Sequence, residues 1–122
     1  MRSALAVAIC GFALLSGRAL AQEACPQPQE PAPIDGAQVS EDQMRAAAGA
    51  ARSFIAQSDV YQACLANVVD AARTQAAADG KPLDPALESD AKARADANQK
   101  VKERVGAEIN IAISVYKKTH LK

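Results

Sequence analysis

Few side chains in this sequence have the types and spacing that chemistry needs. Cys25 and Cys64 stand 39 positions apart with no histidine or further cysteine near either, which is not the ligand spacing of a zinc site. The single histidine, His120, is the third residue from the C-terminal end, where no neighbouring groups would orient it for a catalytic triad or a metal. The chain has neither a glycine-rich phosphate loop nor a serine set between the glycines of a nucleophile elbow. We therefore expect no enzyme activity, no metal and no cofactor.

The tyrosines and carboxylates have structural explanations. Tyr61 and Tyr116 recur at helical spacing with other apolar residues, which is typical of core packing rather than of a ligand pocket. Acidic and basic residues alternate at three and four positions in the second half of the chain, as on the solvated face of a helix. They are Asp90, Lys92, Arg94, Asp96, Lys100, Lys102, Glu103, Arg104 and Glu108.

Residues 1–21 have the three parts of a cleavable signal peptide. Arg2 supplies the positive start, an uncharged run extends from Ala4 to Leu15, and Ala19-Leu20-Ala21 is a small-residue cleavage site. The apolar run has about 12 residues where a spanning helix needs roughly 20, so we expect no membrane span in the mature chain. A lipoprotein signal does not fit, because Cys25 follows Gln22-Glu23-Ala24. We predict export, with the mature protein periplasmic or secreted.

Cleavage after Ala21 removes Cys10 and leaves Cys25 and Cys64 as the two cysteines of the mature chain. An even count in a compartment that permits disulfides predicts that they pair. The loop they would close is about 40 residues long, for which the chain-entropy model gives roughly 4 kcal/mol of stabilisation. The alternative is a small core residue at Cys64 and a free thiol at Cys25, which is a liability in an oxidising compartment.

The charge balance bears on the class of partner. The whole chain has 14 Lys and Arg against 14 Asp and Glu, and loss of Arg2 and Arg18 leaves 12 basic residues against 14 acidic ones, a net charge of −2. Nucleic acids and anionic membranes attract proteins with a surplus of Lys and Arg. We therefore expect neither as a partner.

Residues 22–39 are predicted to form an extended N-terminal arm. Prolines at alternating positions fix the backbone angles and remove amide donors, so the arm should be polyproline-like. They are Pro26, Pro28, Pro31 and Pro33. Such a segment serves either as a spacer, which is the commoner role, or as a ligand for a groove of another protein.

Residues 40–122 are predicted to form an all-α domain, a long antiparallel helical hairpin of the coiled-coil type. Ser40 and Gln43 have the capping-box spacing at the start of the first helix, and 13 alanines follow before Gly80 ends it. Asp59 and Gln62 repeat the capping-box spacing. One long helix and a first helix broken near Ser58 therefore both remain open.

The second helix is predicted from Asp84, with Pro85 at its first position, to about Lys118. If the two helices fold back about a turn centred near residue 82, residues whose numbers sum to about 164 should lie opposite each other. This register places Tyr61 and Leu65 against Val105 and Val101, so that large side chains meet large ones.

The end of the second helix is apolar nearly all round. Its larger residues alternate with smaller or polar ones, which is the period of a strand, but helical spacing also fits, and we interpret the segment as helix because a lone strand has nothing to pair with. Two helices cannot bury both sides of this end, so we predict self-association, a partner protein, or a third helical layer made by a break near Ser58, with the arm supplying part of the cover in each case. The residues of this predicted partner-binding face are Ile109, Ile111, Ile113, Val115 and Tyr116.

One short segment carries a resemblance. The run Gln57-Ser58-Asp59-Val60-Tyr61-Gln62-Ala63-Cys64 resembles the cysteine-bearing helix of small secreted bacterial proteins of the lysozyme-inhibitor class. The likeness covers under a tenth of the chain, and the short cysteine spacing of that class is absent. It therefore implies no function here.

Two hypotheses about function follow. The first is a non-enzymatic exported protein that acts as an interaction or structural module of the bacterial cell envelope, with the Ile-rich face as its contact surface. The alternative is a periplasmic binder of small apolar ligands or of unfolded client proteins, with the cleft between the helices as its site. Solution mass separates them, because a stable dimer would occupy the Ile-rich face, whereas a monomer with a dye-binding groove would indicate a carrier.

Overall fold

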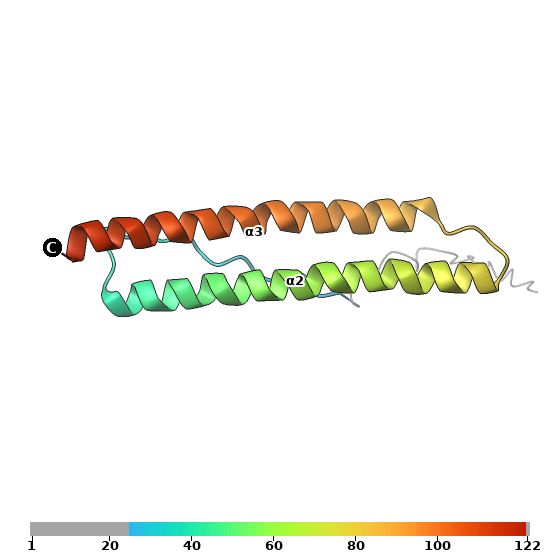
Figure 1. Cartoon of the computed structure of the whole chain (residues 1–122), viewed down its shortest axis with the longest axis horizontal. Coiled ribbons are helices and arrows are strands. Elements are labelled where there is room, and N and C mark those ends of the chain that lie inside the picture. Colours follow the sequence, from blue (N-terminus) through green and yellow to red (C-terminus); the bar gives the residue numbers. More distant parts are fainter. Residues whose placement is uncertain (1–24, 122) are drawn as a thin grey trace, which may run out of the picture.

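The computed structural model describes residues 25–121, which fold into two long helices joined by a short loop (Figure 1). α2 spans Glu41–Ala78 and α3 spans Pro85–His120, and the two run antiparallel along each other. This confirms the predicted all-helical hairpin. The predicted signal peptide at residues 1–21 and the first residues of the arm lie outside the described residues.

Local hydrogen bonds at both ends of α2 match the sequence signals. The Ser40 hydroxyl accepts from the Gln43 amide at 3.3 Å, while the Ser40 amide donates to Gln43 Oε1 at 2.9 Å, which completes the capping box. At the other end Gly80 adopts a left-handed conformation with a φ of 64°. Its amide donates to Ala77 O and the next amide donates to Ala76 O, so the last carbonyls of the helix are satisfied as in a Schellman motif.

α2 continues unbroken past Ser58, so of the two readings that the sequence left open the single long helix is correct. The side chains that could have capped a new helix are engaged with α3 instead. Asp59 forms an ion pair with Lys102 at 2.6 Å, and Gln62 donates to Asn98 Oδ1 at 2.9 Å. Because these groups bond across the hairpin, they do not compete for backbone amides of their own helix.

α3 begins where proline and an acidic cap predict it. The Asp84 carboxylate accepts from the Ala86 amide at 2.9 Å, and Pro85 occupies the first helical position, where a missing amide costs nothing. The segment with alternating isoleucines lies within this helix, so its interpretation as helix is confirmed.

The register of the two helices differs from the predicted one. Residue numbers of pairs hydrogen-bonded across the hairpin sum to between 155, for Tyr61 and Arg94, and 161, for Gln62 and Gln99, rather than to about 164. α3 is therefore displaced along α2, and the last turns of α2 project beyond the start of α3 (Figure 1). The connecting loop does not turn tightly but runs back toward the hairpin, and its Leu83 packs against the core.

The displacement changes which core residues meet. Leu65 and Tyr61 pack in a cluster with Ala91 near the turn, rather than with the valines of α3 that the predicted register placed there. A second cluster joins Phe54 to Val105, with Val101 packed against it. Large residues of α2 thus face alanines in the half of the hairpin near the turn, which leaves that half thinly packed.

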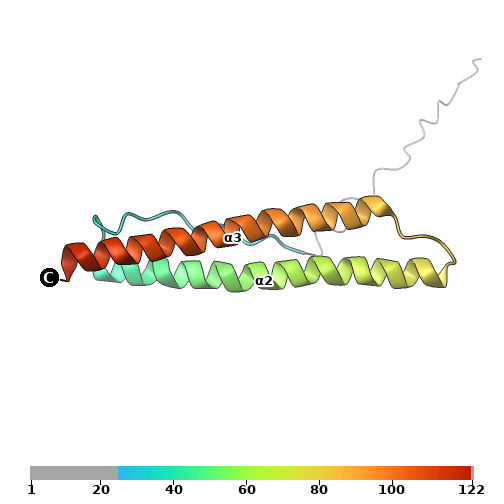
Figure 2. The same ribbon diagram turned by 45° about the horizontal axis from the view of Figure 1, so that its top comes forward.

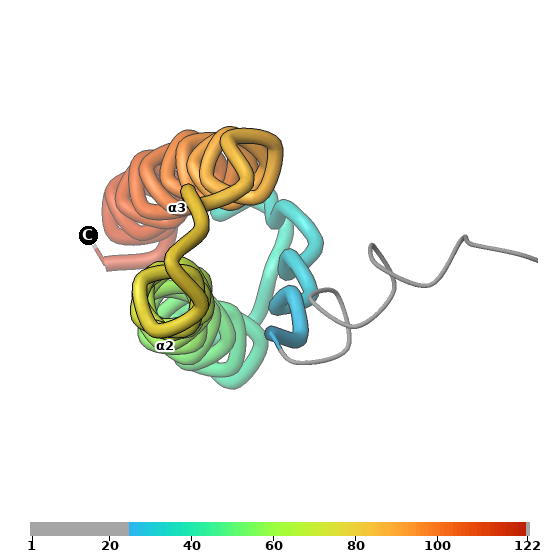
Figure 3. The backbone as a smooth tube through the Cα atoms, turned by 90° about the vertical axis from the view of Figure 1, so that its right-hand side faces the viewer, coloured from blue at the N-terminus to red at the C-terminus, as the bar shows by residue number. Residues whose placement is uncertain are grey.

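The arm forms the third layer of the molecule. From Cys25 it runs back along the helices to the start of α2, and it lies on one side of the α2–α3 pair over the half of the hairpin away from the turn (Figures 2 and 3). In the part of the chain that the structure describes, no segment covers the opposite side (Figure 3). Neither described helix combines the length and the apolar composition needed to cross a membrane.

Candidate functional site

A disulfide ties the arm to the middle of α2. Cys25 and Cys64 are bonded with their Cα atoms 5.7 Å apart, which confirms the predicted pairing. Cys25 has no exposed surface and packs in the cluster of Tyr61 and Leu65. The chain from Cys25 to Ser40 is therefore fixed at both ends, by the disulfide at one and by the capping box of α2 at the other.

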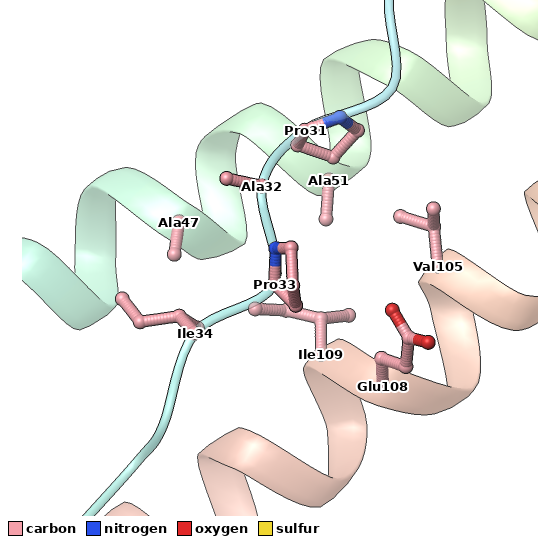
Figure 4. Close-up of a pocket in the computed structure, with 9 residues that line it drawn as sticks. All are labelled: Pro31, Ala32, Pro33, Ile34, Ala47, Ala51, Val105, Glu108 and Ile109. Atoms are coloured by element: carbon pink, nitrogen blue, oxygen red, sulfur yellow. The ribbon is translucent and has the colours of Figure 1, made fainter. Parts of the chain in front are cut away.

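Between these ends the arm is packed into the groove between the two helices (Figure 4). Pro33 and Ile34 lie over Ala51 of α2 and Ile109 of α3, and the space left among them is about 20 Å³, which is room for roughly one water. Among the described residues, the backbone hydrogen bonds outside the helices involve the arm once, from the Gln38 amide to Asp35 O. The arm is thus held by side-chain packing rather than by a backbone ladder.

One ion pair adds to this attachment. Arg104 of α3 donates to the Glu30 carboxylate at 2.6 Å and to Glu108 at 3.2 Å. The hydrogen bond with Glu30, followed by that with Glu108, raises the pKa of Arg104. An arginine is protonated throughout the physiological range in any case, so the charge of Arg104 stays constant there.

Gly36 lies directly against the backbone of α3. A Cβ atom at this position would stand 2.0 Å from Ala112 O and 2.9 Å from the Tyr116 amide nitrogen, and both of these atoms are backbone. The close approach therefore requires glycine, because a helix backbone cannot give way to a methyl group.

We expect Gly36→Ala to lower the free energy of unfolding by about 1–3 kcal/mol, since the clash must be relieved by lifting the arm. Urea unfolding measures the loss, and hydrogen exchange of residues 34–39 should rise. Gly49→Ala is the matched control, because a Cβ there meets nothing within 4 Å, and it should stabilise α2 by about 0.5–1 kcal/mol. Equal effects of the two changes would contradict the assigned role of Gly36.

A buried polar layer crosses the centre of the hairpin. Asn98 of α3 donates to the Ser58 hydroxyl at 3.2 Å and accepts from Gln62 at 2.9 Å, and Gln62 also donates to Gln99 Oε1 at 3.2 Å. Ser58 and Asn98 are almost completely buried. Every buried side-chain nitrogen or oxygen of the described residues has a hydrogen-bond partner. The layer therefore satisfies itself and fixes the register of the helices, as polar core positions do in coiled coils.

Removing the centre of this layer should be costly. We expect Asn98→Ala to lower the free energy of unfolding by about 1–3 kcal/mol, because Ser58 and Gln62 lose their shared partner inside the hairpin. Asn110→Ala, at an exposed position of the same helix, should change it by less than about 0.5 kcal/mol. Denaturant midpoints of the two variants provide the comparison, and similar midpoints would show that the layer contributes nothing specific.

The side of the hairpin opposite the arm has a groove of about 320 Å³ near the turn. Its apolar lining comes from Leu65, Ala66 and Val69 of α2 and from Ala91 and Ala95 of α3, and the small alanines leave it hollow. Polar residues form its edges, namely Gln62, Asp70, Glu88 and Lys92.

This groove continues along the hairpin through residues seven positions apart, which share one side of a helix in a coiled coil. In α2 the spacing leads from Val69 through Gln62 to Ile55, and in α3 from Gln99 through Gly106 to Ile113. A Cβ on Gly106 would lie 3.9 Å from Ile55 Cδ1, so the two rows are adjacent. We call this surface the open face. It comprises Ile55, Asp59, Gln62, Ala66, Val69, Lys92, Ala95, Gln99, Lys102, Gly106 and Ile113, of which Asp59 and Lys102 form an ion pair across the hairpin.

The predicted partner-binding face is not one surface in the structure. Ile109 packs against the cluster of Phe54 and lines the space beneath the arm, and Ile113 belongs to the open face. Ile111 is 65% exposed, whereas Val115 and Tyr116 are partly buried. A helix turns by about 100° per residue, so residues that alternate in sequence are distributed around it.

The other residues singled out by their chemistry have local roles. His120 stacks on Tyr116 with 4.4 Å between ring centroids, one turn apart on α3. Tyr61 is buried and its hydroxyl accepts from Arg94 Nε at 3.1 Å. Among residues 25–121, no group of three or more His, Cys, Asp or Glu residues lies close enough to hold a metal ion.

Sequence reasoning missed the polar layer. In the sequence analysis Ser58 marks only a possible break of the first helix. A usable signal was present, since Asn98 is the polar residue that interrupts the alanine stripe of the second helix between Ala91 and Lys100. Two interruptions at core positions of antiparallel helices predict a pair, and recognising them would also have corrected the register.

Three comparisons with known proteins complete the description of the chain. No family model, no curated protein and no solved structure matches it.

Proposed function

We propose that this chain is an exported, non-enzymatic helical protein that acts through protein contacts as an interaction or structural module of a bacterial cell envelope. The observation that supports this best is the asymmetry of the hairpin. One side is covered by the chain's own arm, while the open face carries half-buried apolar residues and a hollow groove with no described segment over it. Such surfaces on helical proteins serve as contact sites.

The charges agree with a protein partner. The charged residues of the open face are paired within the chain, Lys92 with Asp96 in its own helix and Asp59 with Lys102 across the hairpin. A face of this composition can pack against another apolar and amide-bearing surface without burying an unpaired charge.

A second function is favoured by one observation. Beside the arm, Pro26, Pro28 and Val60 line an open groove of about 430 Å³, and Val60 is 70% exposed. This volume lies in the range of about 300–1,000 Å³ that small-molecule sites occupy. A binder of small apolar ligands or of an unfolded client would use this groove. An apolar fluorescent dye that binds the wild-type protein but not the Val60→Glu variant would reveal it.

Photo-cross-linking in cells tests the first proposal. The full gene is expressed in a bacterial host with a photoreactive amino acid at Ala66 on the open face, or at the exposed Ala71, about 140° around α2, as the matched control. We expect a discrete adduct from position 66 and none from position 71. Fractionation and the N-terminal mass of the same protein test export and cleavage after Ala21. An intracellular protein, or no adduct from position 66, would contradict the proposal.

A further inference from the structure

We infer that the open face is the interface between two copies of this chain, packed antiparallel about a twofold axis that crosses the helices near the Gln62–Gln99 pair. The result is a four-helix bundle with the arms outside. The inference rests on the proposed function and names the partner of the same face. Three observations carry it: the shape of the face, its charges and its extent.

The two ends of the open face are complementary in shape. Ile55 stands seven residues before Gln62, and Val69, in the hollow groove, stands seven residues after it. A twofold axis at Gln62 places Ile55 of one copy against the hollow at Val69 and Ala66 of the other, and the reverse contact forms at the other end. Large side chains then fill space that alanines leave, which is what dense packing requires.

The alternative twofold axis runs along the helices and keeps the two turns at the same end. It sets the hollow groove of one copy against the hollow groove of the other, so that the about 320 Å³ on each side becomes a void. Atoms that line such a void lose their packing contacts, so the twofold axis that crosses the helices is favoured.

Charges at the edge of the open face match the same axis. Arg52 and Asp70 are 18 residues apart, which is five turns, so both lie along one edge of α2, and their midpoint is residue 61. Asp70 is exposed and is paired with Arg73 at 2.8 Å. Arg52 has no ion-pair partner within the described part of the chain. The twofold axis places Arg52 beside Asp70 of the second copy, twice per dimer.

The extent of the face is sufficient. The open face runs for about 21 Å along α2, from Ile55 to Val69, and for about 32 Å along α3, from Lys92 to Ile113. At a helix diameter of about 10 Å this gives a footprint of roughly 500 Å² per copy, or about 1,000 Å² in total, which reaches the lower limit of a specific interface. At the centre, the Gln62 Oε1 atom and one N–H of the Gln99 amide are not used by the hydrogen bonds within the chain, and they can bond to the same residues of the second copy.

The first experiment measures solution mass by light scattering over a concentration series, on the exported, oxidised protein. We expect a dimer. Ala66→Glu should raise its dissociation constant by on the order of 100-fold, because each interface then buries two carboxylates. Ala71→Glu, also at an exposed alanine of α2, should leave it within about threefold. Circular dichroism confirms that both variants keep their helix content.

The second experiment tests the axis by charge reversal. Arg52→Asp and Asp70→Arg should each weaken the dimer by roughly tenfold, because each creates two like-charge contacts. The double variant exchanges the two charges and should recover to within about threefold of the wild type. Recovery would be absent if Arg52 and Asp70 of different copies did not meet, and that result overturns the proposed axis even when every variant folds.

The outcomes separate this inference from the proposed function. A monomer at all concentrations, or a dimer indifferent to Ala66→Glu, overturns the inference. If position 66 then cross-links to a different protein, the proposed function stands and only its partner was misassigned. If position 66 gives no adduct and the protein is a monomer, both fail.

Discussion

Replacing both cysteines, as Cys25→Ser with Cys64→Ser, is expected to lower the free energy of unfolding by about 4 kcal/mol. The bond closes a loop of 39 residues, and its loss returns that conformational freedom to the unfolded chain. For a small domain whose total stability is of the order of 5–15 kcal/mol, this is a large fraction. Urea unfolding of the exported protein against the double variant gives the value.

The effect should be local in the folded state. Residues 25–39, the described part of the arm, form no backbone hydrogen bonds with the helices, so without the disulfide residues 25–33 are held by packing and by the Glu30–Arg104 pair. We expect hydrogen exchange of residues 25–33 to rise well before that of α2 and α3. The wild-type protein treated with a reductant is the control and should behave as the double variant does. An unfolding free energy unchanged by both treatments would mean that the disulfide is dispensable.

Phe54→Ala is expected to lower the free energy of unfolding by about 3–5 kcal/mol. Phe54 is 3% exposed and packs against Ala51 and Val105, at the point where both helices and the arm meet. The cavity would stay largely open, because Ala51 has no side-chain freedom with which to fill it and the β-branched Val105 has few alternative rotamers.

The control for this variant is Val60→Ala, six positions further along the same helix. Val60 is 70% exposed, so its truncation should change stability by less than about 0.5 kcal/mol. Thermal and urea unfolding of the two variants should therefore differ clearly. A loss at position 54 no greater than that at position 60 would show that the cluster of Phe54, Ala51 and Val105 is not the core of this half of the hairpin.

The two helices and their ends are determined by residues that are close together in the sequence. The capping box at Ser40, the left-handed Gly80 and the proline at the start of α3 each act over a few positions, and each predicted its helix end correctly. The pairing of Cys25 with Cys64 was predicted because they are the two cysteines left after signal cleavage, and it is also confirmed. Export, localisation and the absence of enzyme activity stay predictions.

The candidate site was predicted only in outline. From the sequence we predict an apolar helical surface that needs cover and assign it to the contiguous stretch 109–116. In the helix these residues are distributed between the core, the contact with the arm and solvent. A cleft between the helices was foreseen, but its lining residues were not, because the hollow groove of the open face arises where the large residues of α2 meet the alanines of α3. That meeting depends on the register.

The sequence alone determined what depends on short range: two long helices with their ends, an extended proline arm and one disulfide. The tertiary structure decided the register, the unbroken course of α2 past Ser58, the burial of Asn98 and the side of the hairpin that the arm covers. The physical reason is distance along the chain. Ser58 and Asn98 are 40 residues apart, and whether such groups pair is settled only when the helices are side by side and each buried polar atom must find a partner.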